Sequence, residues 1–290
     1  MSRNNIKLVA VDLDGTLLIT GNTKTSEKNN RSDSELPEST PLFMAPEGAR
    51  MLKAASQNGI HIILATSRVI DSVRELCQPL KLDRPVICAN GAQIFESINR
   101  VLLKSITFPR EIGLEIARLA DTNNWELSIT VGSTTYHKQR SGQEVGPLAT
   151  GRIIVAKNRD AVTDDLTRIL VHDPEAIREI MTFCESMFTN ECRIERYTEP
   201  NGMSLGIFGK GADKGNALDF VLKRLGIGQS EVMAIGDDLN DLPLFSRAGI
   251  RVAMGNAQLE LKEQATVVVP TNEDEGVAWA LREYGISPRN

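Results

Sequence analysis

The sequence predicts an α/β fold in which a Rossmann-like parallel sheet is interrupted by a smaller, inserted α+β domain. Three observations predict it. Strands and helices alternate through the first ninety residues, short strands and a hairpin follow, and the alternating pattern returns in the last third of the chain. Such alternation is typical of parallel sheets, because each strand needs a crossover helix before the next parallel strand can begin. We therefore expect one core built from two separate stretches of chain.

The first ninety residues are expected to form three strands and two helices. Apolar runs predict strands at 6–11, 61–65 and 85–89, and the helical spacing of apolar residues predicts helices at 47–58 and 68–80. The polar segment from Thr20 to Thr40 has no apolar periodicity, and we interpret it as a mobile loop. It leaves the first strand near its end, so a site at that strand end would lie within its reach.

From Ala92 the pattern changes to that of a small α+β domain. The elements expected there are strands at 94–95, 101–106 and 166–171, a helix at 111–123, a hairpin of 125–131 with 134–138, and a helix from Asp173 through Met187. After Gly202 the parallel pattern is expected to return, with strands at 204–208, 232–235, 250–253 and 266–269 and helices at 216–225 and 241–246. We thus predict a core of residues 1–91 and 205–290 and an inserted domain of residues 92–204.

Composition excludes several classes of function. The chain of 290 residues has a formal net charge of −5, so it offers no basic field for nucleic acid or for an anionic membrane surface. No apolar run approaches the roughly 20 residues that a membrane-spanning helix needs. The four cysteines form no Cys-x-x-Cys pair, so we expect reduced thiols in the cytoplasm and no zinc site: Cys77, Cys88, Cys184 and Cys192.

Two aspartates follow the first strand directly, in Val9-Ala-Val-Asp-Leu-Asp-Gly-Thr-Leu-Leu18. Because side chains alternate along an extended chain, Asp12 and Asp14 are expected to point the same way. Ligands of open parallel sheets collect at the carboxyl ends of the strands. Two adjacent carboxylates repel one another without a cation, so the pair predicts Mg²⁺, a hard ion that favours oxygen ligands. On this segment alone, an acidic turn after an ordinary strand is an equal alternative.

A second acidic loop follows a later strand, in Val232-Met-Ala-Ile-Gly-Asp-Asp-Leu-Asn-Asp241. A buried strand here releases three acids and an amide into a tight loop, which is costly unless cations offset the charge. We expect Asp237 to be a metal ligand, and Asp238 and Asp241 to order metal-bound water and neighbouring groups. Asn240 could donate to a phosphate. The alternative is a solvated turn that caps the next helix.

Two further segments offer groups for phosphoryl oxygens. The strand before Arg68 ends in Thr66 and Ser67, whose hydroxyls and helix-start N–H groups suit phosphate, although both residue types are also ordinary helix caps. Lys214 begins a helix, where a lysine opposes the helix dipole unless an anion compensates it. A solvated surface lysine is the alternative. The glycine-rich segment around it fits neither the P-loop nor the dinucleotide-binding spacing, so we reject an ATPase or an NAD enzyme.

Taken in order, these segments resemble the four motifs of the haloacid dehalogenase-like (HAD) hydrolases: Asp12-Leu-Asp-Gly-Thr16, Thr66-Ser-Arg68, Lys214 and Gly236-Asp-Asp-Leu-Asn-Asp241. The chain is most similar to the Cof-type sugar-phosphatase branch, in which an α/β cap enters after a third-strand Asn-Gly, here Asn90-Gly91. The resemblance spans nearly the whole chain. Two features depart from it: the Thr20–Thr40 segment is longer than usual, and Ser67 replaces the commoner glycine.

The resemblance implies a Mg²⁺-dependent phosphatase acting on a small phosphorylated metabolite such as a sugar phosphate. Asp12 would attack phosphorus and form an aspartyl-phosphate, while Asp14 would act as general acid and then as general base. The Asp12 carboxylate, the Asp14 carbonyl and Asp237 would hold the metal. The residues expected to contact the substrate are Thr66, Ser67, Asn90, Lys214 and Asn240.

The same residues leave two other functions open. A mutase similar to the phosphomannomutases would return the phosphoryl group to the sugar, and arginines of the inserted domain could hold a second phosphate: Arg140, Arg152, Arg159 and Arg193. A non-catalytic sensor of phosphorylated metabolites is the third possibility. The sequence names neither the substrate nor the oligomeric state.

Overall fold

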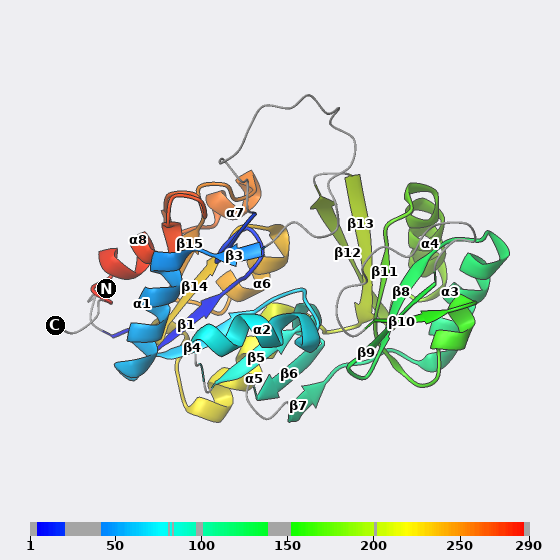
Figure 1. Ribbon diagram of the computed structural model, residues 1–290, viewed down its shortest axis with the longest axis horizontal. Coiled ribbons are helices and arrows are strands. Elements are labelled where there is room, and N and C mark those ends of the chain that lie inside the picture. Colours follow the sequence, from blue (N-terminus) through cyan, green and yellow to red (C-terminus); the bar gives the residue numbers. More distant parts are fainter. Residues whose placement is uncertain are drawn as a thin grey trace. The chain divides into compact units, whose positions relative to one another are not determined.

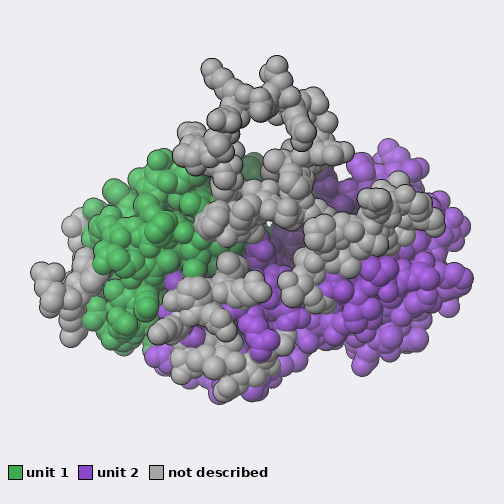
Figure 2. All heavy atoms as spheres, in the orientation of Figure 1, with its two compact units in different colours: residues 1–62, 227–290 green, residues 63–226 purple. Residues whose placement is uncertain are grey.

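The computed structural model describes residues 5–20, 42–80, 82, 84–96, 101–138, 152–199 and 202–286 of the chain. The chain divides into two compact units, residues 1–62 with 227–290 and residues 63–226 (Figure 2). It passes from the first unit to the second within strand β4 (His61–Ala65). Apart from Thr20, the segment Thr20–Thr40 lies outside the described residues, so its interpretation as a mobile loop stays a prediction. In the described part of the chain, no helix has both the length and the apolar character to cross a membrane.

The first unit contains parallel strands in the order β16-β15-β14-β1 (Figure 1). Their bounds are Leu8–Val11 for β1, Val232–Gly236 for β14, Ile250–Ala253 for β15 and Val267–Val268 for β16. Every residue of β1 and β14 is buried, which explains why both read as unbroken apolar runs rather than as alternating ones. All four strands were expected from the sequence and are confirmed.

Four α-helices and a pair of short antiparallel strands are also found among the described residues of the first unit. The helices are α1 (Pro46–Gln57), α6 (Leu242–Phe245), α7 (Leu259–Glu263) and α8 (Gly276–Glu283). The N-terminus of α1 is capped from a distance, because the carboxylate of Glu275 accepts hydrogen bonds from the backbone N–H groups of Glu47 and Gly48, at 3.0 and 2.8 Å. Strand β2 (Leu18–Thr20) pairs antiparallel with β3 (Leu42–Met44), a pairing that was not predicted.

The second unit contains two sheets, the first of which continues the strand–helix alternation. Strand β4 pairs in parallel with β5 (Pro85–Cys88), and β6 (Gln93–Glu96) and β7 (Leu102–Ser105) follow in antiparallel order. The helices α2 (Ile70–Leu80) and α5 (Lys214–Leu225) lie in the same unit. Gly226 ends α5 in the left-handed conformation that favours glycine.

The other sheet of the second unit has six strands in the order β10-β9-β8-β11-β13-β12. Their bounds are Arg152–Val155 (β10), Thr134–Lys138 (β9), Leu127–Val131 (β8), Leu166–Val171 (β11), Gly202–Gly209 (β13) and Cys192–Glu199 (β12). One of its faces packs against α3 (Arg110–Thr122) and α4 (Pro174–Met187), as Figure 1 shows, and their apolar residues form one core with the strands. This is the α+β domain that the sequence predicts.

Three expected strands lie in a different sheet from the one that the sequence predicts. The strands expected at 94–95 and 101–106 in the inserted domain are β6 and β7, which pair with β5 and with each other and not with the six-stranded sheet, because short apolar runs do not reveal their pairing partners. Ser204 to Phe208 was expected in the parallel sheet, but it lies in β13, which pairs antiparallel with β11 and β12 in the six-stranded sheet. The run is buried, and a buried apolar run does not reveal its pairing partner. The predicted division into a core of 1–91 and 205–290 and an inserted domain of 92–204 stays a proposal, and the pairing of β13 favours a second boundary after Gly209.

Candidate active site

Asp12 and Asp237 stand beside one another because of the register between β1 and β14. Leu8 pairs with Val232 and Val11 with Ile235, in parallel. Each strand then ends, and the backbone N–H of Asp12 donates a 3.0 Å hydrogen bond to the carbonyl of Ile235. The two acidic loops therefore leave the sheet at the same edge, as expected for the carboxyl ends of parallel strands.

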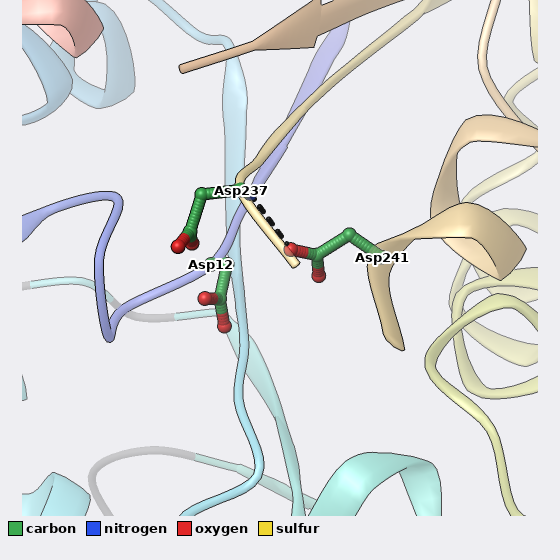
Figure 3. A group of neighbouring side chains, drawn as sticks. All are labelled: Asp12, Asp237 and Asp241. Carbon is green, nitrogen blue, oxygen red and sulfur yellow. Dashed lines mark hydrogen bonds between the residues drawn. The ribbon is translucent and has the colours of Figure 1, made fainter. Parts of the chain in front are cut away.

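Three carboxylates converge at this edge. Asp12, Asp237 and Asp241 each offer an oxygen, and these oxygens all lie within 4.8 Å of one another (Figure 3). Asp12 is 4% exposed and Asp241 is fully buried. Acidic groups this close repel one another unless a cation offsets their charge, and carboxylate oxygens are the ligands that Mg²⁺ prefers. The donor set therefore fits a divalent metal ion.

Asp241 has a larger part in this group than the sequence indicated. It was expected to order water and neighbouring groups, but its carboxylate belongs to the cluster itself. Its Oδ2 also accepts hydrogen bonds from the backbone N–H groups of Asp237, at 3.0 Å, and Asp238, at 3.4 Å (Figure 3 shows the first). Asp238 instead caps the next turn, accepting from the N–H of Leu239 at 2.8 Å. Asp241 thus shapes the loop that presents Asp237.

The loop after β1 holds the Asp237 carboxylate directly. The hydroxyl of Thr16, which is fully buried, donates to Oδ1 of Asp237 at 2.8 Å. Gly15 has a φ of +73°, and a Cβ atom placed on it would lie 2.1 Å from Oδ2 of Asp237. Only glycine accommodates both this backbone conformation and this approach. Asp14, in the same loop, is half-buried and lies outside the three-carboxylate group.

Sequence reasoning missed a residue that supports this loop from a third strand. The side-chain amide of Asn256 donates a 2.8 Å hydrogen bond to the carbonyl of Gly15. Two backbone groups near Asn256 support the other acidic loop, the one after β14. The N–H of Met254 donates to the carbonyl of Gly236, and the N–H of Gln258 donates to the carbonyl of Asp237. The sequence could have indicated this role of Asn256, because the segment follows β15 closely and parallel strands such as β1, β14 and β15 end at the same edge of a sheet.

Four of the predicted substrate-binding residues gather in the second unit. The backbone N–H of Asn90 donates to the carbonyl of Thr66 at 3.0 Å. A Cβ atom on Gly91 would lie 2.1 Å from the carbonyl oxygen of Asp213, so the Asn90–Gly91 turn packs closely against the residue before Lys214. Thr66 and Asn90 are fully buried, and Ser67 follows Thr66 at the end of β4.

The structure tests the non-catalytic interpretations of these residues, a surface lysine for Lys214 and a helix cap for Thr66. Lys214 is fully buried, so a solvated surface lysine is wrong. Thr66 does not cap α2, which begins four residues later at Ile70; its hydroxyl oxygen accepts a hydrogen bond within the turn, from the backbone N–H of Arg68 at 3.1 Å. In the first unit, Asn240 is buried, 7% exposed, between Asp238 and Asp241. That the groups of the two units serve one site stays a prediction.

Known proteins are similar to this chain along nearly its whole length. Residues 42–281 match the family model described as haloacid dehalogenase-like hydrolase. The chain is 29% identical over 282 residues to the 5-amino-6-(5-phospho-D-ribitylamino)uracil phosphatase YcsE of Bacillus subtilis, covering 97% of this chain and 96% of that one. It is 24% identical to the pyridoxal phosphate phosphatase YbhA of Escherichia coli, over 94% of this chain and 96% of the relative.

Solved structures share the fold. The sugar phosphatase BT4131, of HAD subclass IIB, aligns with a TM-score of 0.74 at 22% identity and covers 97% of this chain and 99% of its own. A haloacid dehalogenase-like hydrolase from B. subtilis aligns with a TM-score of 0.75 at 25% identity, over 96% of this chain and 99% of that chain. The α/β fold with an additional α+β domain, expected from the sequence, is therefore confirmed.

Proposed function

The chain belongs to the haloacid dehalogenase-like hydrolases, as a phosphoric monoester hydrolase of the Cof type, and from this premise we propose a mechanism, a metal and a substrate class for it. We propose that it releases inorganic phosphate from a small phosphorylated metabolite, that it forms an aspartyl-phosphate on Asp12, and that it uses Mg²⁺. The observation that carries the proposal is the convergence of Asp12, Asp237 and Asp241.

Under this proposal Asp12 is the nucleophile. One of its carboxylate oxygens forms a bond to phosphorus while the bond from phosphorus to the leaving-group oxygen breaks. Asp14 gives its proton to the departing oxygen, then takes a proton from the water that attacks the phosphorylated Asp12, which restores both carboxyl groups. The half-buried position of Asp14 supports this division of work, because its carboxylate stands apart from the three-carboxylate group.

The metal would be held by the carboxylates of Asp12 and Asp237 and by the backbone carbonyl of Asp14, with Asp241 beside them. When bound, Mg²⁺ supplies positive charge that stabilises the negative oxygens of the phosphoryl group. Thr16 and Asn256 support these ligands by fixing the Asp237 carboxylate and the Gly15 carbonyl.

The remaining predicted residues would bind the phosphoryl group and the substrate. Lys214 carries a positive charge into a buried position, which is favourable when an anion lies against it. Thr66 and Ser67 would donate to phosphoryl oxygens from the end of β4, and Asn240 would donate from the acidic loop. Asn90 would contact the substrate beyond the phosphoryl group.

The substrate class and the location of the protein belong to the same proposal. YcsE and YbhA are named as phosphatases of small phosphorylated metabolites, which supports that substrate class for this chain. We also propose that the protein works in the cytoplasm. Cys184 and Cys192 are buried thiols, and burial raises the pKa of each to about 12, so they are chemically unreactive.

The test is phosphate release from p-nitrophenyl phosphate with Mg²⁺. Asp12→Asn should abolish turnover, and Asp14→Ala should lower it by about 10² to 10⁴-fold, as for a lost acid–base group. Asp164→Asn, an exposed aspartate of the second unit, is the matched control and should leave turnover unchanged. Acid quenching of the parent enzyme during turnover should leave a phosphoryl group on the peptide that contains Asp12.

Contrary results would separate the alternatives. Full activity of Asp12→Asn would show that Asp12 is not the nucleophile. Full activity in excess chelator would show that hydrolysis does not need a metal ion. An isomerised sugar phosphate without free phosphate would point to a mutase, and tight binding of phosphorylated metabolites without any turnover would point to a sensor.

A further inference from the structure

The two faces of the six-stranded sheet differ in chemistry. Ile129, Ile169 and Ile207 lie on adjacent strands in register and belong to the apolar core with α3 and α4. Residues one position along each strand face the other way, because side chains alternate across a sheet. The other face is therefore not the one covered by those helices, and its residues are largely polar.

A single row across this polar face carries three arginines. Paired residues across the strands run Arg152, Thr135, Thr130, Arg168, Phe208 and Arg193. We call this set the arginine row. Arg193 is balanced by an ion pair with Glu195, and its guanidinium lies 6.0 Å from the centre of the Phe208 ring. Arg152 and Arg168 have no carboxylate partner among the residues that the structure describes.

Arg168 is the most unusual member of the row. It is 7% exposed, and burial lowers its pKa to about 10, so it stays positively charged at neutral pH. Its guanidinium donates to the carbonyl of Ser67 at 2.7 Å and, weakly, to the hydroxyl of Thr130 at 3.4 Å. Both acceptors are neutral, and a guanidinium has five N–H donors. A buried cation with spare donors and no counter-ion is costly unless a ligand supplies the negative charge.

Two further buried polar groups belong to the same unit as Arg168. In the part of the chain that the structure describes, the hydroxyl of Tyr197 and both polar atoms of the Asn90 side chain have no hydrogen-bond partner. Burial raises the pKa of Tyr197, so its hydroxyl keeps its proton and can donate. Buried polar groups normally have partners, and several orphans in one place indicate a ligand or ordered water.

These groups lie in one neighbourhood of the second unit. A Cβ atom placed on Gly206 would meet the rings of both Tyr197 and Phe208, and Phe208 pairs across the strands with Arg168 and Arg193. Tyr197 also packs against the small apolar cluster that contains Phe208 and Ala89, the residue before Asn90. Ala89 and Asn90 both have positive φ, of 48° and 55°, a strained conformation for residues other than glycine. Such strain often marks a functional site.

We propose that Arg168, Tyr197 and Asn90 bind the leaving group of the substrate, and that this leaving group carries a second oxyanion, either a carboxylate or a phosphate. This inference rests on the proposed phosphatase function and deepens it. Arg168 and Tyr197 would donate to the oxyanion. The Asn90 amide can donate to it as well and can accept from a hydroxyl next to it, so a hydroxylated acid phosphate suits these three side chains.

The experiment compares matched substrate pairs on the full-length enzyme with Mg²⁺. Glucose 6-phosphate and 6-phosphogluconate differ by a carboxylate, and fructose 6-phosphate and fructose 1,6-bisphosphate differ by a phosphate. We expect kcat/KM to be at least tenfold higher for the charged member of one pair, and the pair that shows it identifies the oxyanion. p-Nitrophenyl phosphate serves as the reference substrate because its leaving group lacks a second anion.

Variants then assign the preference to residues. Arg168→Met should lower kcat/KM for the preferred substrate by 10- to 100-fold more than it lowers kcat/KM for p-nitrophenyl phosphate, and Tyr197→Phe should have a smaller effect of the same kind. Arg168→Lys should restore part of the preference, since it keeps the charge but not the guanidinium geometry. Arg196→Met is the matched control, because Arg196 is exposed on β12, one position from Tyr197, and pairs with Glu185.

Two outcomes would overturn the inference. One is equal kcat/KM for the two members of each pair in the parent enzyme. This result is measured on the parent alone, so it does not depend on whether any variant folds. The other is an equal loss on p-nitrophenyl phosphate in Arg168→Met, which would show that Arg168 acts only through the Ser67 loop or on the phosphoryl group. Absence of any phosphate release by the parent would instead contradict the proposed function.

Discussion

The hydroxyl of Thr16 donates a hydrogen bond of 2.8 Å to Oδ1 of Asp237, joining two loops that lie 221 positions apart in the chain. The bond uses one lone pair of the carboxylate and fixes the direction of the others. Groups that orient metal ligands in this way typically contribute 10- to 100-fold in metal affinity.

Thr16→Val should therefore raise the Mg²⁺ concentration for half-maximal activity by about 10- to 100-fold, with little change in kcat at saturating metal. The measurement is a Mg²⁺ titration of p-nitrophenyl phosphate hydrolysis. Thr163→Val, at an exposed threonine, provides the control and should give the parent curve. An unchanged Mg²⁺ requirement in Thr16→Val would mean that Asp237 does not hold the metal.

Gly15→Ala should lower kcat/KM by more than about 100-fold, because its methyl group would displace the Asp237 carboxylate by colliding with Oδ2. Gly59→Ala is a matched control, since Gly59 also has a positive φ, of +89°, but has open space around it. Both variants bear a backbone cost of about 1–2 kcal/mol. Similar kinetics in the two variants would show that the close approach at Gly15 has no catalytic consequence.

Asp241→Asn should weaken both the metal site and the fold. The substitution removes one of three clustered charges and disturbs the acceptor for the Asp237 and Asp238 N–H groups. We expect a Mg²⁺ requirement at least tenfold higher and a loss of about 1–3 kcal/mol in the free energy of unfolding. Asp238→Asn changes the same charge in the same loop, where the side chain is only half-buried, and should affect both quantities less. The opposite ranking would assign the metal to Asp238.

Glu47 should contribute stability that depends on pH. The hydrogen bonds from Arg50 hold the pKa of Glu47 at about 2, below its ordinary value of 4.5, and Arg282 adds to the effect. Because the folded-state pKa is the lower one, the contribution is fully present above pH 4.5 and is lost as the pH falls through about 2. Glu47→Gln should therefore cost up to about 1 kcal/mol at pH 7, since the pair is partly solvated, and progressively less below pH 4.5.

Urea unfolding of the parent and of Glu47→Gln, at pH 7 and at stepwise lower pH, measures this difference. Glu263→Gln, at an exposed glutamate of α7, should show no comparable trend. A difference for Glu47→Gln that grows towards acid would reverse the assigned sign.

The acidic groups could be predicted from the sequence because each follows a buried strand directly. Strand ends in parallel sheets share an edge, so Asp12 and Asp237 were expected together, and the register of β1 and β14 bears this out. The position of Asp241 within the cluster was beyond local reasoning, because it depends on the turn of the loop between the strand and α6. The support from Asn256 was missed for a similar reason, since an exposed amide in a turn has no periodicity to mark it.

Strand partners were harder to predict than strands. Ser204 to Phe208 is apolar and buried, which fits either sheet, and only its pairing with β11 and β12 decides between them. Arg168 lies in a strand recognised by its apolar residues, and the sequence does not show that its guanidinium is buried against the Ser67 carbonyl. That contact joins segments 101 positions apart.

The four residue pairs between β1 and β14 have a consequence for how this protein can vary. The spacing of Asp12 and Asp237 is set by the backbone ladder of two adjacent strands, not by the length of chain that separates them. Insertions or deletions between the loop that contains Gly15 and Thr16 and the start of β14 leave the carboxylates in place as long as both strands keep their pairing. A shift of one residue within either strand, by contrast, would turn its aspartate away from its neighbour. The chain between the two strands can therefore vary widely while the proposed nucleophile and metal ligand keep their spacing.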